Sequence, residues 1–180
     1  MNIRRGNVIL GVTGSIAAYK AVELLRLLRK DGYEVRVVMT PSATRFVGEL
    51  TFRTLSQHPV LVDMFAAPDI WEPAHIAWAQ RAAVMLIAPC TANVLAKLAH
   101  GLADDALTAT ALACEAPLIV APAMNSAMWR NAATLANVRT LRERGVQVID
   151  PVAGEMACGT SGPGRMPEPP DILRVLRELK

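Results

Sequence analysis

"NVILGVTGSIAAYK" (Asn7–Lys20) combines an apolar run, a glycine-bearing turn and the start of an amphipathic pattern. Asn7–Val12 lacks regular polar alternation, which is typical of a strand buried on both faces of a parallel sheet. Apolar residues then recur on one helical stripe: Ala17, Ala21, Leu24, Leu25 and Leu28. The stripe ends near Gly32, and glycine commonly forms the C-cap of a helix. The stretch therefore predicts a strand, a tight turn and a helix.

The same alternation continues along the chain. Strand-like runs recur at Glu34–Met39, Ala83–Ala88, Pro117–Ala121 and Val146–Asp150. Helical patterns lie at Thr44–Ser56 with a break at Gly48, Thr91–His100, Asp104–Cys114, Ala132–Gly145 and Pro170–Lys180. Strands that alternate with helices favour an α/β fold with right-handed crossovers. We therefore expect a three-layer, Rossmann-like (flavodoxin-like), doubly wound parallel sheet, in a single domain over residues 1–180.

The composition indicates a well-buried globular domain. The chain has 180 residues, of which 52% are apolar, and a net charge of +3. No apolar run approaches the ~20 residues needed to span a bilayer, and the N-terminus lacks a signal-peptide pattern. We therefore expect a cytoplasmic protein without a membrane partner.

The charged and metal-binding residue types exclude other classes of function. Acidic residues are interspersed with the basic ones and only 4% of residues are aromatic, which favours solvated helix faces over nucleic-acid binding. Cys90, Cys114 and Cys158 are widely spaced and form no CxxC motif. The sequence therefore predicts neither a disulfide framework nor a metal site.

The first turn is a candidate phosphate site. Gly11 and Gly14 permit a tight turn, Ser15 can cap the helix, and the N–H groups of its first turn can face an anion. The spacing is not G-x-G-x-x-G, and the second strand leads into hydroxyl groups rather than an acid suited to an adenosine ribose. These hydroxyls belong to Thr40, Ser42 and Thr44. The pattern suits a mononucleotide such as FMN better than NAD, although the turn alone is equally compatible with an ordinary strand–helix connection.

Two further strand-end segments carry polar residues. "APCTAN" (Ala88–Asn93) and "APAMN" (Ala121–Asn125) each follow a predicted strand. In open α/β sheets, ligands bind outside the carboxyl ends of the strands. Three strand-end segments are therefore expected to converge on one crevice. The non-periodic segment Pro151–Pro169, with four glycines and four prolines, reads either as a functional cover or as a linker.

Six motifs resemble those of the homo-oligomeric flavin-containing cysteine decarboxylases, in the family's order and over nearly the whole chain. They are "GSIAAYK", "ELTFRTLS", "HIAWA", "APCTANVLAKLAHGLADD", "PAMNSAMW" and "ACGTSGPGRMPEP". "PAMNSAMW" matches the pattern P-x-M-N-x-x-M-W at every fixed position. The resemblance implies FMN-dependent decarboxylation of 4′-phosphopantothenoylcysteine to 4′-phosphopantetheine, a carboxy-lyase step of coenzyme A biosynthesis.

The resemblance also implies the residues of the site. Those around the flavin or its phosphate are Gly14, Ser15, Ser42, Thr91, Ala92 and Asn93, with Thr40 or Thr44 as alternatives to Ser42. The catalytic residues are His75, Asn125 and Cys158, and the substrate-binding residues are Met124, Asn125, Ala157 and Cys158. Residues 151–169 would form a flap over the substrate.

A flavin is needed because side chains alone offer no electron sink for this decarboxylation. Oxidation of the substrate CH₂–SH group to a thioaldehyde lets CO₂ leave as an enethiolate forms, and the hydride then returns. By the resemblance, His75 acts as base or holds the carboxylate, Asn125 donates to the carboxylate, and Cys158 returns a proton. The alternatives are a structural role for His75 and a helix N-cap role for Asn125.

The implied assembly is a homotrimer, or a homododecamer built from trimers, with FMN at the subunit interface. Two other functions remain open. Thr160 replaces the acid usual after "ACG", so an oxidative decarboxylase of a peptide C-terminal cysteine is an alternative. A non-catalytic flavin-binding regulatory subunit is disfavoured because the catalytic trio is present. The chain could be a stand-alone enzyme or one domain of a bifunctional one.

Overall fold

A parallel sheet forms the centre of the molecule, and its strand order places a ligand site. The computed structural model describes residues 6–65, 74–155, 159 and 161–179. Within these residues the sheet has six strands in the order β3-β2-β1-β4-β5-β6, all paired in parallel. The strands are β1 (Asn7–Val12), β2 (Glu34–Met39), β3 (Val60–Leu61), β4 (Val84–Cys90), β5 (Leu118–Pro122) and β6 (Gln147–Val148).

The chain builds outward from β1 in one direction through β2 and β3, then returns to add β4, β5 and β6 on the other side. The reversal lies between β1 and β4. At such a switch point the connections leave in opposite directions and open a crevice at the carboxyl ends of the strands. The predicted doubly wound sheet is confirmed, and its switch point falls on the two turns that the sequence singles out.

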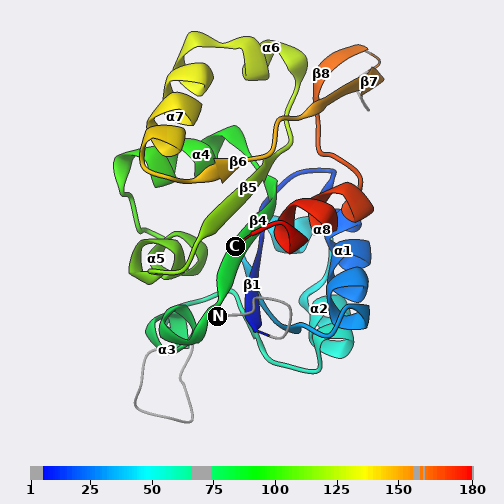
Figure 1. The fold of residues 1–180 in the computed structure, drawn as a ribbon, viewed down its shortest axis with the longest axis vertical. Helices are drawn as coiled ribbons and strands as arrows, with labels where there is room; N and C mark the ends of the chain where they lie inside the picture. Colours follow the sequence, from blue (N-terminus) through cyan, green and yellow to red (C-terminus); the bar gives the residue numbers. More distant parts are fainter. Residues whose placement is uncertain (1–5, 66–73, 156–158, 160, 180) are drawn as a thin grey trace.

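Helices cover both faces of the sheet (Figure 1). They are α1 (Ala18–Lys30), η2 (Ala43–Arg45), α2 (Glu49–Ser56), α3 (Ala74–Arg81), α4 (Ala92–His100), α5 (Ala106–Ala113), α6 (Ser126–Arg130), α7 (Ala132–Glu143) and α8 (Pro169–Arg177). Helices α1, α2 and α8 pack on one face through one apolar cluster, and α3, α4, α5 and α7 pack on the other through a second. Successive β1 residues alternate between the clusters: Leu10 joins the first and Ile9 the second. The three layers are therefore confirmed.

The structure differs from the sequence-based expectation mainly in short or weakly patterned elements. Strand β3, helix α3 and the hairpin formed by β7 (Val152–Glu155) and β8 (Ser161–Arg165) were not predicted. The expected strand Val146–Asp150 has only two strand residues. "SGPGR" carries no apolar alternation, so its antiparallel pairing has no local signature. The break expected at Gly48 is confirmed, because Gly48 is the N-cap of α2.

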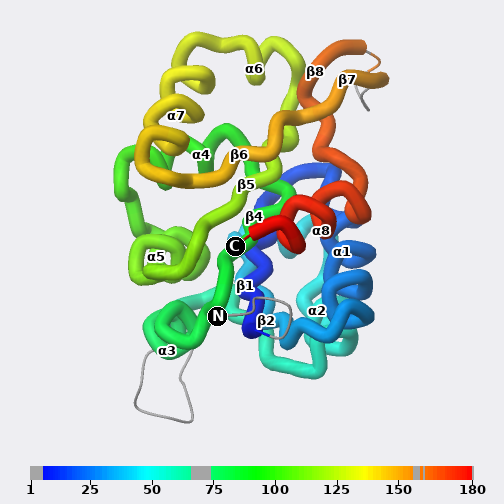
Figure 2. The backbone as a smooth tube through the Cα atoms, in the orientation of Figure 1, coloured from blue at the N-terminus to red at the C-terminus, as the bar shows by residue number. Residues whose placement is uncertain are grey.

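The backbone trace in Figure 2 shows how the hairpin is attached to the rest of the fold. After β6 the chain leaves the sheet and runs outward along β7, and β8, which contacts α6, then leads back to α8. The hairpin is a separate two-stranded sheet. It therefore adds a wall beyond the carboxyl edge of the central sheet.

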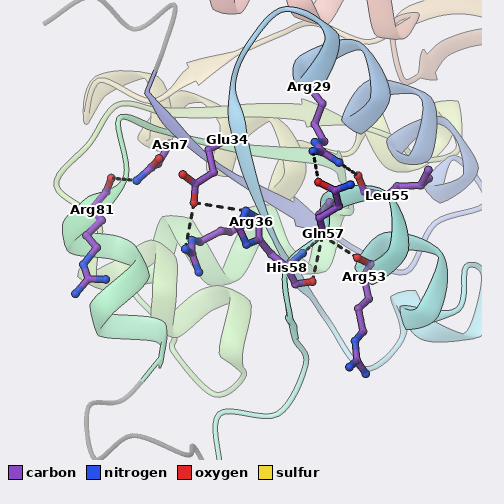
Figure 3. Close-up of polar contacts among 10 residues, drawn as sticks. Asn7, Arg29, Glu34, Arg36, Arg53, Leu55, Gln57, His58 and Arg81 are labelled. Carbon is purple, nitrogen blue, oxygen red and sulfur yellow. Dashed lines mark hydrogen bonds and ion pairs between the residues drawn. The ribbon is translucent and has the colours of Figure 1, made fainter.

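Polar contacts fasten the opposite, amino edge of the sheet (Figure 3). Arg29, at the end of α1, donates to the Leu55 carbonyl at 2.5 Å and to Gln57 Oε1 at 2.8 Å. Gln57 has a positive φ of 61° and ends α2. Asn7 Nδ2 donates to the Arg81 carbonyl at 3.2 Å, which ties the end of α3 to the start of β1. These contacts belong to the scaffold rather than to the crevice.

Two classes of site are not found among the residues that the structure describes. None of the helices there combines the length and apolar character required to cross a membrane. Nor do His, Cys, Asp and Glu side chains gather there in groups of three or more that could hold a metal ion.

Candidate functional site

A cleft of about 720 Å³ opens at the carboxyl edge of the sheet, at the switch point. Its volume is within the range of about 300–1,000 Å³ typical of small-molecule sites. Six predicted site residues line it: Gly14, Ser15, Thr91, Ala92, Met124 and Asn125. Ser42, Asn93 and His75 are described but are not among the lining residues. The predictions for Ala157 and Cys158 fall outside the described residues.

Two walls bound the cleft. The sheet wall comprises residues 14–15, after β1, and residues 91–92, after β4. The hairpin wall comprises residues 124–125, after β5, and residues 164–166, at the end of β8 and just after it. Figure 1 shows β8 beside the segment that links β5 to α6.

Gly14 in the sheet wall touches the turn after β2. A Cβ atom on Gly14 would lie only 2.5 Å from Ser42 Oγ. The Ser42 hydroxyl is also 3.1 Å from Thr40 Oγ1, while Thr44 Oγ1 donates to the Pro41 carbonyl at 2.8 Å. Of the three candidate hydroxyls after β2, Ser42 therefore lies against the glycine turn. A side chain at position 14 would collide with Ser42, so this glycine lets the turns after β1 and β2 pack closely.

Ser15 does not cap the first helix, which corrects that expectation. Helix α1 begins at Ala18 with Ala17 as its N-cap, and no side-chain cap bond is present there. Ser15 Oγ instead accepts a hydrogen bond from Ala17 N–H at 3.3 Å. The residue organises an extra turn between strand and helix, which local spacing could not distinguish from a cap.

Thr91 caps the second helix of the sheet wall. Its Oγ1 accepts from Val94 N–H at 3.4 Å, and α4 begins at Ala92. The first N–H groups of a helix have no partners within it and attract anions. Ala92 opens this helix inside the cleft, so the sheet wall presents the N-terminus of α4 in the same cleft as the Gly14 turn.

Asn125 in the hairpin wall is the N-cap of α6, as the structural alternative expected. Its Oδ1 accepts from Ala127 N–H at 2.7 Å. The residue also lines the cleft. The cap uses the amide oxygen, so Nδ2 is the donor end of the same side chain. The cap role is therefore compatible with donation to an anionic substrate group.

The hairpin rests directly on this asparagine loop through backbone contacts. Met124 N–H donates to the Gly164 carbonyl at 2.9 Å. A Cβ on Gly164 would lie 2.3 Å from the Met124 carbonyl oxygen, and the residue has a φ of +150°. Only glycine adopts this conformation in this space without strain. Gly164 therefore permits close packing here, rather than hinge motion.

A lysine joins the two walls at the base of the hairpin. Lys20 Nζ lies 2.6 Å from Glu168 Oε1 and 3.4 Å from the Met166 carbonyl, and its side chain is 8% exposed. Arg165 Nη2 approaches the same carboxylate at 3.6 Å. Lys20 and Arg165 both line the cleft. Neither was predicted, because a lysine on a helix ordinarily indicates a solvated face.

His75 lies on α3, away from both walls. Helix α3 packs against α5, and Figure 1 places it at the opposite end of the molecule from the hairpin. His75 Nδ1 is buried and has no hydrogen-bond partner among the described residues. One copy of the chain therefore does not bring His75 to Asn125.

The lining fits a phosphorylated ligand with a planar ring, such as FMN. The N-terminus of α4, which shares the cleft with the Gly14 turn, suits a phosphate. Ile16, Tyr19 and Met128 line the cleft with apolar surface and are 63%, 62% and 49% exposed. Met128 was expected to form part of the apolar wall of the pocket, whereas Ile16 and Tyr19 were missed, because apolar residues at the start of an amphipathic helix carry no separate signal.

Neither cysteine that the structure describes belongs to the cleft chemistry. Cys90 is fully buried at the end of β4, and burial raises the pKa of its thiol. Burial also raises the pKa of Cys114, whose Sγ lies 3.8 Å from the Ala79 carbonyl. Both remain protonated thiols near neutral pH and serve as packing groups.

Known proteins share this architecture over nearly the whole chain. The family model described as Flavoprotein matches residues 1–179. Among solved structures, the FMN-dependent cysteine decarboxylase SpaF is 34% identical with a TM-score of 0.84, covering 97% of both chains. A cysteine-to-serine mutant of PPC decarboxylase, complexed with pantothenoylaminoethenethiol, is 35% identical with a TM-score of 0.84, covering 96% of this chain and 97% of that one.

Curated relatives are longer than this chain. The coenzyme A biosynthesis bifunctional protein CoaBC of Mycolicibacterium smegmatis is 47% identical over 97% of this chain and 42% of its own length. The CoaBC protein of Vibrio vulnificus is 43% identical over 96% of this chain and 43% of its own length. The chain thus spans less than half the length of these relatives. On the match over residues 1–179, the chain belongs to the Flavoprotein family.

Proposed function

We propose that this domain is an FMN-dependent carboxy-lyase that converts 4′-phosphopantothenoylcysteine to 4′-phosphopantetheine in coenzyme A biosynthesis. The observation that carries the proposal is the cleft that the N-terminus of α4 and Asn125 both line. The similarity to CoaBC proteins and to a PPC decarboxylase structure supports the same reaction. The biosynthetic role of these relatives supports a cytoplasmic location.

FMN would be held by the sheet wall and its neighbours. The proposed binding residues are Gly14, Ser15, Ser42, Thr91, Ala92 and Asn93. When bound, FMN supplies a reversible two-electron exchange with the substrate CH₂–SH group, so that CO₂ leaves from a thioaldehyde and an enethiolate results. The reaction is then a decarboxylation without net oxidation.

The hairpin wall would handle the substrate. Asn125 donates from Nδ2 to the substrate carboxylate, and a neutral amide holds this anion without the stabilisation that a cation would give. Met124 contributes apolar surface. Cys158, with Ala157 beside it, returns the proton to the enethiolate from within the flap formed by residues 151–169. A closed flap would exclude water from the reactive thiocarbonyl group.

His75 would act in the cleft of a second copy, as base or as a ligand of the carboxylate. Asn125 lines the cleft of a single copy but His75 does not, which supports a role for His75 beyond the single chain. The exposed apolar side chains of Ile16, Tyr19 and Met128 at the cleft support burial against another subunit. We propose a homo-oligomer, a trimer or a dodecamer of trimers, with FMN at the interface.

The direct test is incubation of the FMN-loaded protein with 4′-phosphopantothenoylcysteine, followed by mass analysis. Loss of CO₂ with the saturated thiol as product is the expected result. A second candidate is oxidative decarboxylation of a peptide C-terminal cysteine, with which the likeness to the FMN-dependent cysteine decarboxylase SpaF is compatible. Turnover of a cysteine-terminated peptide alone, with an enethiol product, would replace the first proposal by the second. Binding of FMN without either turnover would favour a regulatory subunit.

The shared site is tested by mixing two inactive variants. His75→Asn and Asn125→Asp subunits are unfolded together, refolded as hybrids and assayed. Recovery of roughly a quarter of wild-type activity is expected, because random mixing pairs an intact His75 with an intact Asn125 in that share of interfaces. Hybrids as inactive as their parents would show that both side chains act within one subunit. Each variant refolded alone is the control.

A further inference from the structure

We infer that Thr13 is a positioning residue that sets the spacing between the two halves of the sheet wall. The inference rests on the proposed function, since it concerns the residues proposed to hold FMN. Thr13 is fully buried. Its Oγ1 donates to the Pro89 carbonyl at 2.8 Å and accepts from Thr91 N–H at 3.1 Å. One hydroxyl thus donates to the end of β4 and accepts from the turn that follows β4.

The position of Thr13 gives these two bonds their importance. The pairing of β1 with β4 extends from Val8 to Gly11, opposite Val84 to Ile87. The ladder between β1 and β4 therefore ends at Gly11 and Ile87, before Thr13 is reached. Over the same part of β4, its register against β5 also shifts, between Ile87 and Cys90. The Thr13 hydroxyl continues the connection into the turns.

The two ends of this link lead directly to the proposed cofactor contacts. Gly14 and Ser15 follow Thr13, and Ala92 follows Thr91. Thr91 uses its own side chain to cap α4, while its backbone N–H is bound to Thr13. A phosphate held by both turns requires a fixed distance between them. Thr13 supplies that constraint, and it acts through its neighbours because it is not among the described residues that line the cleft.

Substitution separates this role from ordinary burial. Thr13→Val keeps the shape of the side chain but leaves the Pro89 carbonyl and the Thr91 N–H without the hydroxyl partner. Thr13→Ser keeps the hydroxyl and removes only a methyl group. A buried polar group that loses its partner costs more than the bond was worth, since it cannot reach water. We expect the turns after β1 and β4 to move apart in Thr13→Val but not in Thr13→Ser.

The experiment measures FMN affinity of the apoprotein by fluorescence titration, together with thermal unfolding without FMN. We expect Thr13→Val to weaken FMN binding by about tenfold or more, and Thr13→Ser by no more than about threefold. The matched control is Thr110→Val. Thr110 is also fully buried, and its Oγ1 donates to the Ala106 carbonyl at 2.6 Å within α5. It should lower the melting temperature while leaving FMN affinity unchanged.

The outcomes are distinguishable from failure of the proposed function. A wild-type protein that does not bind FMN overturns the proposed function. A wild-type protein that binds FMN, with Thr13→Val binding equally well, overturns the positioning role. Equal loss of affinity in Thr110→Val would also overturn it, since the effect would then follow from stability alone. If Thr13→Val does not fold, Thr13→Ala removes the same hydroxyl with less bulk and should show the same loss of affinity relative to Thr13→Ser.

Discussion

The sheet wall and the hairpin wall face one cleft but are held together by different means. In the sheet wall, the turns after β1 and β4 are joined by the buried hydroxyl of Thr13. In the hairpin wall, β8 lies on the asparagine loop through glycine backbone, and Gly164 leaves no room for a side chain. The first is an extension of the central sheet, whereas the second is a separate sheet docked beside it.

This difference predicts that the two walls fail separately. Damage to the sheet wall should lower FMN affinity. Substitutions in the hairpin wall should leave FMN affinity unchanged and abolish turnover, because that wall carries Asn125. Four predictions test this separation, and the first three each pair a cleft residue with a matched residue elsewhere.

The largest effect is expected from Gly164→Ala. The added Cβ would collide with the Met124 carbonyl oxygen at a φ of +150°. We expect stability to fall by about 3 kcal/mol or more and activity by more than ~100-fold, measured by chemical denaturation and by product formation. FMN affinity should change by less than ~3-fold, since the sheet wall is untouched.

Gly101→Ala is the control for the backbone conformation alone. Gly101 also has a positive φ, of +69°, but its Cβ would meet nothing within 4 Å. It should cost only about 1 kcal/mol with normal activity. Equal effects of the two substitutions would contradict the close packing of β8 on the asparagine loop.

The second prediction compares two asparagine caps. Asn125 caps α6 and Asn131 caps α7, each by accepting from the N–H two residues ahead, at 2.7 and 2.9 Å. Asn125→Ala and Asn131→Ala should each cost about 1 kcal/mol of stability. Only Asn125→Ala should lower kcat, by about 100-fold. Normal turnover in Asn125→Ala would show that Asn125 serves only as a helix N-cap.

The third prediction concerns the ion pair at the base of the hairpin. Lys20→Met removes a nearly buried partner of Glu168 and should lower the free energy of unfolding by about 1–2 kcal/mol. It should also speed proteolytic cleavage within the hairpin. Arg174→Met breaks an ion pair with Asp171 in which both side chains are at least half exposed. This control should change stability by less than ~0.5 kcal/mol. A similar loss of stability in both variants would argue against a role of Lys20 in holding the hairpin in place.

The smallest effect is a rate of thiol alkylation, followed in a Cys158→Ser variant. Burial raises the pKa of Cys90 and Cys114, so the thiolate fraction at pH 8 is lower in the folded protein than in the unfolded chain. Iodoacetamide should therefore label both thiols at least ~10-fold more slowly before urea is added than after. Rapid labelling of Cys90 under native conditions would show that the sheet wall opens, because Cys90 lies directly before it.

Much of the scaffold was predictable because its signals are local. Asn7–Val12 and Glu34–Met39 are strands with the predicted bounds, since continuous β-branched and apolar runs indicate burial on both faces. The Gly48 break and the Thr91 helix start follow from residues adjacent in sequence. The hairpin could not be predicted, because its pairing uses backbone groups and glycines that carry no hydrophobic period.

The site was predicted in part. The residues that were missed share one property, which is that no local pattern reveals their role. Strand-end turns at the switch point were enough to bring Gly14, Thr91 and Asn125 to one cleft. Lys20 was not recognisable, because its partner Glu168 is 148 residues away in sequence. The apolar rim at Tyr19 was equally hidden within an ordinary amphipathic helix.

The sequence by itself determined the alternating strands and helices, the turns that end the strands and the family, since each depends on neighbouring residues or on motif order. Only the tertiary structure decided which distant groups meet. Thr13 finds Pro89 and Thr91 at separations of 76 and 78 residues, Gly164 meets Met124, and His75 is left apart from Asn125. The physical reason is that local periodicity encodes which face of an element is buried, whereas the packing of whole elements sets the distance between side chains far apart in the chain.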